Sequence, residues 1–228
     1  MFRNLMRATA ALFLTLPAHA QGMNGATLGL DYSYNTDRHL SQTVLGGSFG
    51  FGLGGLELQG DLSKRFSNGG ADALSLGAHV IGNVGTASAV GGFLTYDDLA
   101  NSGDDLKLGV EGKFAMTDAL SVEGYLMRVN RSGGRSDFGA IALDASYGLG
   151  GGSSLNAGIF NASGNTDLTR YSVGIGYAVS PAFTVKLDAA RLVSASDRDS
   201  ILGLSLEYAI GGGATFGQRD YPHLLPGF

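Results

Sequence analysis

The sequence contains no cysteine, so neither a disulfide framework nor a thiolate metal site can form. After residue 20 it also lacks any run of the ~18 apolar residues that a membrane-spanning helix needs. If this chain spans a membrane, it must do so as a closed β-barrel, because lipid leaves unpaired backbone groups unsatisfied.

Basic residues are in the minority, and two of them lie close to the N-terminus. Arg3 and Arg7 precede a short apolar run, Ala8–Leu16, and a small-residue cleavage site ends at Ala20. We therefore expect residues 1–20 to be a cleaved secretory signal peptide, since the apolar run is too short for a transmembrane anchor. Its removal leaves 13 basic and 20 acidic residues, a net charge of −7, which argues against nucleic acid as a partner.

Glycine is abundant, with 38 residues, and it lies within segments in which apolar side chains recur at every second position. In Tyr171–Val179 the apolar side chains alternate with small or polar ones, and the alternation resumes in Phe183–Ala189 after a turn at Pro181. Side chains alternate between two faces only in a strand, so these segments predict a hairpin with one apolar and one polar face. Aromatic residues at both ends of the apolar face suit the two interfaces of a membrane.

The same unit recurs along the chain and predicts about twelve strands, although ten or fourteen would also fit. They are Ala26–Tyr34, Leu40–Phe51, Leu56–Phe66, Leu74–Val80, Val90–Tyr96, Leu106–Phe114, Leu120–Leu126, Ile141–Leu149, Leu155–Asn161, Tyr171–Val179, Phe183–Ala189 and Leu202–Ile210. The sequence predicts longer, polar connections after the odd-numbered strands, the longest being Asp97–Asp105. It predicts short turns after the even-numbered strands. This pattern predicts an all-β fold, a single closed antiparallel transmembrane β-barrel over residues 21–210 with both termini in the periplasm. A soluble β-sandwich is the alternative, because its strands alternate as well.

Three stretches carry a resemblance to a known family. They are the hairpin turns TDALSVEGY (Thr117–Tyr125) and SPAFTVKLD (Ser180–Asp188) and the final strand ILGLSLEY (Ile201–Tyr208). With the signal peptide, they resemble Gram-negative outer-membrane β-barrels, in particular small porin-like ones. The resemblance implies an outer-membrane location, contacts with membrane lipid and lipopolysaccharide, and recognition of the last strand by the barrel-assembly machinery. Ile201 departs from the pattern, because a polar residue is usual there.

The C-terminal segment, residues 211–228, departs from the resemblance more seriously. Such barrels usually finish on the aromatic residue that closes the last strand, whereas here Pro222 and Pro226 exclude a regular central strand before Phe228. We expect a periplasmic tail. A segment folded into the lumen and extra pairing at a strand edge are the alternatives.

The polar face of the strands predicts which side chains line the lumen and set its selectivity. These are Asp31, Glu57, Asp61, Arg65, His79, Lys107, Glu111, Lys113, Glu123, Asp144, Arg170, Lys186, Asp188 and Glu207. Eight acids against five bases leave a net charge near −3 with His79 neutral, which favours cations in a pore. We therefore expect a channel for passive diffusion of small hydrophilic solutes or ions. A closed structural or adhesive barrel that acts through its surface loops is the alternative, because charged lumen side chains can also pair and fill the space.

An enzyme is the third reading, and the residues do not favour it. His79 and Ser75 lie on the same face of one strand, too far apart to form a nucleophile–base pair directly. The carboxylates of Asp97–Asp105 could hold a divalent cation, but their spacing is not that of an EF-hand. We expect no enzymatic activity, no metal and no cofactor.

Overall fold

The computed structural model describes residues 22–85, 87–100, 102–164, 167–195 and 197–219. The expected signal peptide and residues 220–228 of the tail lie outside the described residues. Among the described residues, no helix is both long and apolar enough to cross a membrane.

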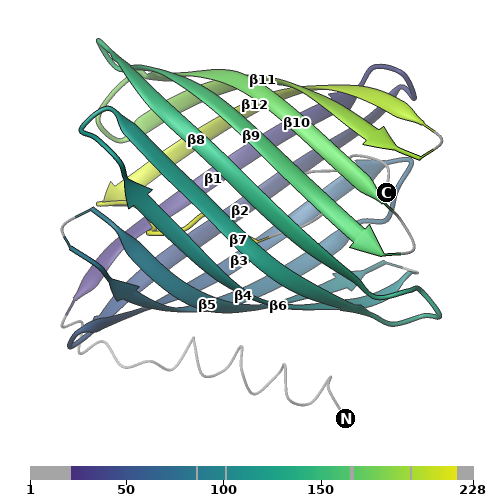
Figure 1. The fold of residues 1–228 in the computed structure, drawn as a ribbon, viewed down its shortest axis with the longest axis horizontal. Helices are drawn as coiled ribbons and strands as arrows, with labels where there is room; N and C mark the ends of the chain where they lie inside the picture. The colour runs from purple at the N-terminus through teal and green to yellow at the C-terminus, as the bar shows by residue number, and fades with distance from the viewer. Residues whose placement is uncertain (1–21, 86, 101, 165–166, 196, 220–228) are drawn as a thin grey trace.

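The described residues form twelve antiparallel strands that close into one barrel, because β1 pairs with β12 as well as with β2 (Figure 1). The all-β closed fold with twelve strands is therefore confirmed. The strands are β1 Met23–Asn35, β2 Leu40–Leu53, β3 Leu56–Asn68, β4 Ala73–Asn83, β5 Ala89–Leu99, β6 Gly103–Ala115, β7 Leu120–Arg131, β8 Phe138–Gly150, β9 Ser153–Gly164, β10 Leu168–Ala178, β11 Phe183–Ser194 and β12 Arg198–Gly211.

The barrel turns its large apolar side chains outward. On β10, for example, Val173 and Ile175 are 62% and 57% exposed, whereas Leu168 on the opposite face is buried. Exposed aromatic residues lie near both ends of the strands, with Tyr32, Phe66 and Tyr171 at one end and Phe114, Tyr147, Tyr177 and Tyr208 at the other. An apolar band between two aromatic girdles is the outer surface of a barrel in lipid.

The two ends of the barrel differ less than the sequence suggested. We call the end at which β1 begins and β12 ends the terminal end, and the opposite one the distal end. The distal connections are three to six residues long and the terminal ones two to five, so the predicted difference in loop length is wrong. The strands instead have 11 to 14 residues and extend into the segments that were expected to be loops.

The stretch Asp97–Asp105 is the largest of these corrections. Asp97–Leu99 and Gly103–Asp105 form the paired ends of β5 and β6, with Asp97 opposite Asp105 and Asp98 opposite Asp104. Asp97 and Asp105 are 0% and 2% exposed, because they face the interior of the barrel and meet basic side chains there. Consecutive polar residues are typical of a loop. In a barrel with a polar lumen they can instead belong to paired strands, with every second side chain facing the lumen.

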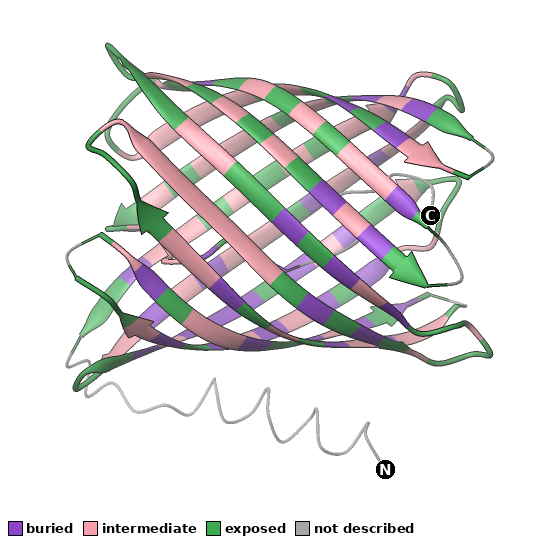
Figure 2. Cartoon of the chain, in the orientation of Figure 1, coloured by how far each residue is buried: buried purple, intermediate pink, exposed green. Residues whose placement is uncertain are grey.

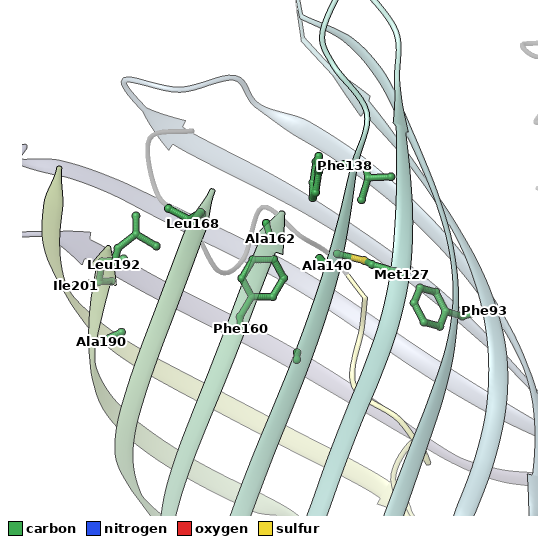
Figure 3. Close-up of a cluster of buried hydrophobic side chains, with 12 residues drawn as sticks. Phe93, Met127, Phe138, Ala140, Phe160, Ala162, Leu168, Ala190, Leu192 and Ile201 are labelled. Atoms are coloured by element: carbon green, nitrogen blue, oxygen red, sulfur yellow. The ribbon is translucent and has the colours of Figure 1, made fainter. Parts of the chain in front are cut away.

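An apolar cluster lies on the inner face of β7–β12 towards the distal end (Figure 3). Figure 2 shows the buried positions on the front strands β8 and β9 gathered in the distal half. We call this group the distal cluster; with Phe93 of β5 it comprises Phe93, Met127, Val129, Phe138, Ala140, Ala142, Phe160, Ala162, Leu168, Ala190, Leu192 and Ile201. The inner face is therefore polar near the terminal end of these strands and apolar near the distal end.

Candidate functional site

The structure divides the predicted lumen residues into two groups. Glu57, Asp61, Arg65, His79, Lys107 and Glu111 lie on β3, β4 and β6, and each is at most 8% exposed. We call the inner face of β3–β6 the packed wall. Asp31, Lys113, Glu123, Asp144, Arg170, Lys186, Asp188 and Glu207 line a cavity of about 670 Å³. We call the inner surface that lines this cavity the open wall. It comes mainly from β8–β12, β1 and β2, and Lys113 of β6 and Glu123 of β7 stand at its border with the packed wall.

The packed wall is covered by the chain that follows β12. From Gly212 to Arg219 the tail runs back inside the barrel, where Phe216 is 1% exposed and packs on Ile81 and Ala89. The Gln59 side chain binds the Phe216 backbone twice, accepting from its N–H at 3.1 Å and donating to its carbonyl at 2.9 Å. The Thr215 hydroxyl donates to Glu57 at 2.7 Å. The described part of the tail is therefore an inner layer of the barrel, at variance with the expected periplasmic tail.

Two glycines on the wall make room for this inner layer. A Cβ at Gly25 would lie 2.2 Å from the Gly213 carbonyl oxygen, and one at Gly46 would lie 2.5 Å from Oε1 of Gln218. The Gln218 side chain donates to the carbonyl of Gly47 at 2.9 Å. A larger side chain at Gly25 would push the tail backbone away from the wall, whereas one at Gly46 would displace the end of the Gln218 side chain.

A chain of charged side chains crosses the packed wall and ends on the tail. His79 lies between Asp61 and Glu111, with Nε2 and Nδ1 each 2.7 Å from a carboxylate oxygen. A ring that donates to both carboxylates is protonated, since a neutral imidazole has only one N–H. Glu111 also accepts from Nε of Arg219 at 2.7 Å, and Glu123 accepts from a terminal guanidinium nitrogen of Arg219 at 2.7 Å.

A second group of buried charges lies further towards the distal end. Nζ of Lys107 is 2.5 Å from Asp97, and both side chains are 0% exposed. Lys107 also donates to the backbone carbonyl of Arg219 at 3.2 Å. Asp105 accepts from Arg135 at 2.5 Å, and Nε of Arg131 lies 3.6 Å from the same carboxylate. These acids pair with bases inside the barrel and do not form a solvated loop.

The open wall carries looser ion pairs. Lys186 and Glu207 are 2.6 Å apart with side chains 38% and 37% exposed, and Arg170 lies 3.4 Å from Asp188. Five acids and four bases line the cavity, the fourth base being Arg219 of the tail. The excess of negative charge around the cavity is therefore smaller than the value near −3 that the sequence suggested.

The geometry offers little for acid–base catalysis. Both ring nitrogens of His79 are engaged by carboxylates, so neither is placed to activate Ser75. Nδ1 of His39, in the connection after β1, is 2.9 Å from the hydroxyl of Tyr34. Within the described ranges, no group of three or more His, Asp or Glu side chains is arranged to hold a metal ion.

One carboxylate outside the strands connects the ends of β1 and β12. Asp37 accepts from the backbone N–H of Ser200 at 2.5 Å, and Arg191 lies 3.8 Å away. The hydrogen bond from Ser200 holds the pKa of Asp37 below its ordinary value of 3.8. This contact joins the distal connection to the strand pair that closes the barrel.

Sequence reasoning missed the side chains that fill the packed wall. Phe216 and Arg219 lie in a tail with no strand pattern, and Gln59 looks like any other polar residue of an inward row. The only local signal is small residues, Gly25 and Gly46, at inward positions of neighbouring strands. The sequence does not show that these glycines make room for the tail, because the tail lies far from them along the chain.

Comparison with solved structures agrees with this architecture. A KdgM porin in complex with disordered oligogalacturonate is similar with a TM-score of 0.67 at 9% identity, covering 80% of this chain and 98% of that one. The fold of this chain is that of the small twelve-stranded outer-membrane porins. An outer membrane channel from Pseudomonas putida F1 gives a TM-score of 0.63 at 15% identity, covering 85% and 98%. A NanC porin gives 0.63 at 10% identity, covering 79% and 98%. No family model matches the sequence, and no curated protein matches it. At these identities the likeness concerns the fold.

Proposed function

We propose that this porin-like barrel is a channel for passive diffusion of small hydrophilic solutes and ions through the outer membrane. The observation that carries the proposal is the cavity of about 670 Å³ inside the barrel, lined mainly by charged side chains, serines and glycines. A barrel that serves only as a scaffold fills its interior with side chains, as small barrels do. Here the tail fills one side of the interior, and the cavity takes up the other side.

A mild preference for cations follows from the charges that line the cavity. Five acids face four bases there, and charged rings in a lumen set the ion preference of a pore. The acids of the packed wall contribute less, because they pair with His79, Lys107 and Arg219. We therefore expect a weak preference and no strong rejection of anions.

The membrane partners follow from the same architecture. The exposed apolar band and its aromatic girdles suit lipid and lipopolysaccharide, and the stretch Ile201–Tyr208 lies in β12, which the assembly machinery would recognise as the last strand.

Single-channel recording of the refolded protein, residues 21–228, in a planar bilayer tests the channel. We expect discrete conductance steps and, in a salt gradient, a reversal potential displaced slightly towards the cation. Circular dichroism and the gel mobility of unheated samples establish that the protein is folded. Silence from folded protein would overturn the channel.

A closed barrel that acts through its distal surface is the second candidate. The distal cluster favours it, since buried Phe138, Phe160 and Leu168 narrow the lumen at that end. Substituting these three residues by alanine distinguishes the two proposals. A closed barrel is silent before the change and conducts after it, whereas a channel conducts in both forms.

A further inference from the structure

Charged and aromatic side chains from the wall and the tail surround the guanidinium group of Arg219. Its side chain is 5% exposed, with Nε 2.7 Å from Glu111 and a terminal nitrogen 2.7 Å from Glu123. The guanidinium carbon lies 4.6 Å from the centre of the Tyr125 ring, and Phe93 and Phe216 flank it at 6.0 and 5.5 Å. Two carboxylates and three aromatic rings therefore form a recess around one planar cation.

This recess fits a guanidinium group better than an ammonium group. Glu111 and Glu123 stand on different strands, and one planar fork reaches both carboxylates while its face lies against Tyr125. An ammonium is a compact, strongly hydrated charge that lacks both the flat face and the rigid fork. The barrel wall supplies both acids and Tyr125, and the tail supplies Arg219 and Phe216.

The wall half of the recess is held in place without the tail. Glu111 is fixed by His79, whose other nitrogen binds Asp61, and Nζ of Lys113 lies 3.8 Å from Glu123. Without Arg219, the carboxylates of Glu111 and Glu123 would lose the cation that they bind beside the Tyr125 ring. Such a site attracts a replacement cation.

We propose that Glu111, Glu123 and Tyr125 form a guanidinium-binding site in the lumen, and that Arg219 is its tethered ligand, which latches the tail to the packed wall. Small solutes that carry a guanidinium group are the class of free ligand that the site takes when Arg219 is absent. A tethered ligand has an effective concentration in the millimolar range, so the natural tail withstands lower concentrations of a free competitor. The site stands independently of whether the lumen conducts.

A thiol placed beneath the tail reports the latch, because the chain has no cysteine of its own. Ala89 is 4% exposed and lies under Phe216, so Ala89→Cys is protected while the tail is docked. Ile81→Cys, at the same contact, is a second reporter that adds no volume. The measurement is the rate at which a small methanethiosulfonate reagent labels the refolded full chain in detergent micelles.

We expect Arg219→Ala to accelerate labelling about tenfold or more, since two charge-assisted hydrogen bonds are lost. Methylguanidinium chloride at about 20 mM, in the millimolar range of a tethered ligand, fills the space between the Tyr125 and Phe216 rings in this variant, restores the packing of Phe216 on the wall and so slows labelling again. Equal methylammonium chloride or sodium chloride does not. Arg191→Ala, which removes an arginine in the distal half of β11 away from the recess, serves as the matched control and leaves labelling unchanged.

Each other outcome overturns part of the proposal. If both reporter thiols are labelled as slowly in Arg219→Ala as in the parent protein, Arg219 is not the latch. Equal slowing by methylammonium shows that the recess does not select guanidinium. Slowing that persists when Glu111→Gln and Glu123→Gln are added to Arg219→Ala places the ligand elsewhere. None of these readings depends on conductance, so they stand apart from the test of the channel.

Discussion

The packed wall and the open wall are built from the same kinds of residue, yet they hold their charges in different ways. Lys107 and Asp97 on the packed wall are fully buried at 2.5 Å, whereas Lys186 and Glu207 on the open wall form a similar pair at 2.6 Å with more than a third of each side chain exposed. The difference comes from the tail, which excludes water from one side of the lumen only. The loss of an inward-facing charge should therefore lower the free energy of unfolding more on the packed wall than on the open wall.

The largest expected effect is on stability at the packed wall. Lys107→Met leaves Asp97 buried beside a side chain that cannot pair with it, and removing one partner of a buried pair destabilises by ~3–5 kcal/mol. Urea unfolding of the refolded barrel measures the change. The matched variant Lys186→Met should lose at most ~1 kcal/mol, because solvent screens the exposed Glu207 that remains. Equal losses in the two variants would abolish the distinction between the walls.

Removal of the tail should turn the packed wall into an open one. A chain that ends at Gly213 exposes Glu57, Asp61 and Glu111 to the lumen and loses Arg219. We expect a larger unit conductance and a reversal potential displaced further towards the cation, because acids gain access to the pore and a base leaves it. An unchanged conductance from folded truncated protein would mean that ions do not pass beside the tail.

The sequence was informative wherever the deciding interaction is local. Alternation along each strand placed all fourteen predicted lumen side chains on the inner face, from Asp31 to Glu207, because a strand turns successive residues to opposite sides. The division into two walls was invisible, since it depends on contacts such as that between Gln59 and Phe216, which are 157 residues apart. The prediction of a loop at Asp97 and Asp105 was wrong, because a polar run gives no sign that Lys107 and Arg135, on the neighbouring strand and the next connection, pair with these acids.

Charge substitutions on the open wall should change selectivity and leave stability nearly unchanged. Lys186→Met removes one of the four bases that line the cavity, and Glu207→Gln removes one of the five acids. We expect opposite displacements of the reversal potential, towards the cation for the first variant and towards the anion for the second. Both should be smaller than the effect of removing the tail. Displacements of the same sign would show that neither side chain faces the ion path.

The smallest effect is expected at Asp37, outside both walls. Its pKa lies below the ordinary value of 3.8 because the Ser200 N–H stabilises the carboxylate, so its contribution to stability is present at neutral pH. That contribution is lost as the pH falls below 3.8 through the pKa of the folded state. Asp37→Asn should therefore lower the urea midpoint slightly at pH 7, by less than Lys107→Met does. Once the pH has fallen below the pKa of the native carboxyl, so that this group is protonated as well, the difference should diminish. A difference that persists undiminished there would assign the effect to the shape of the connection and not to its charge, because the amide keeps the shape and removes only the charge.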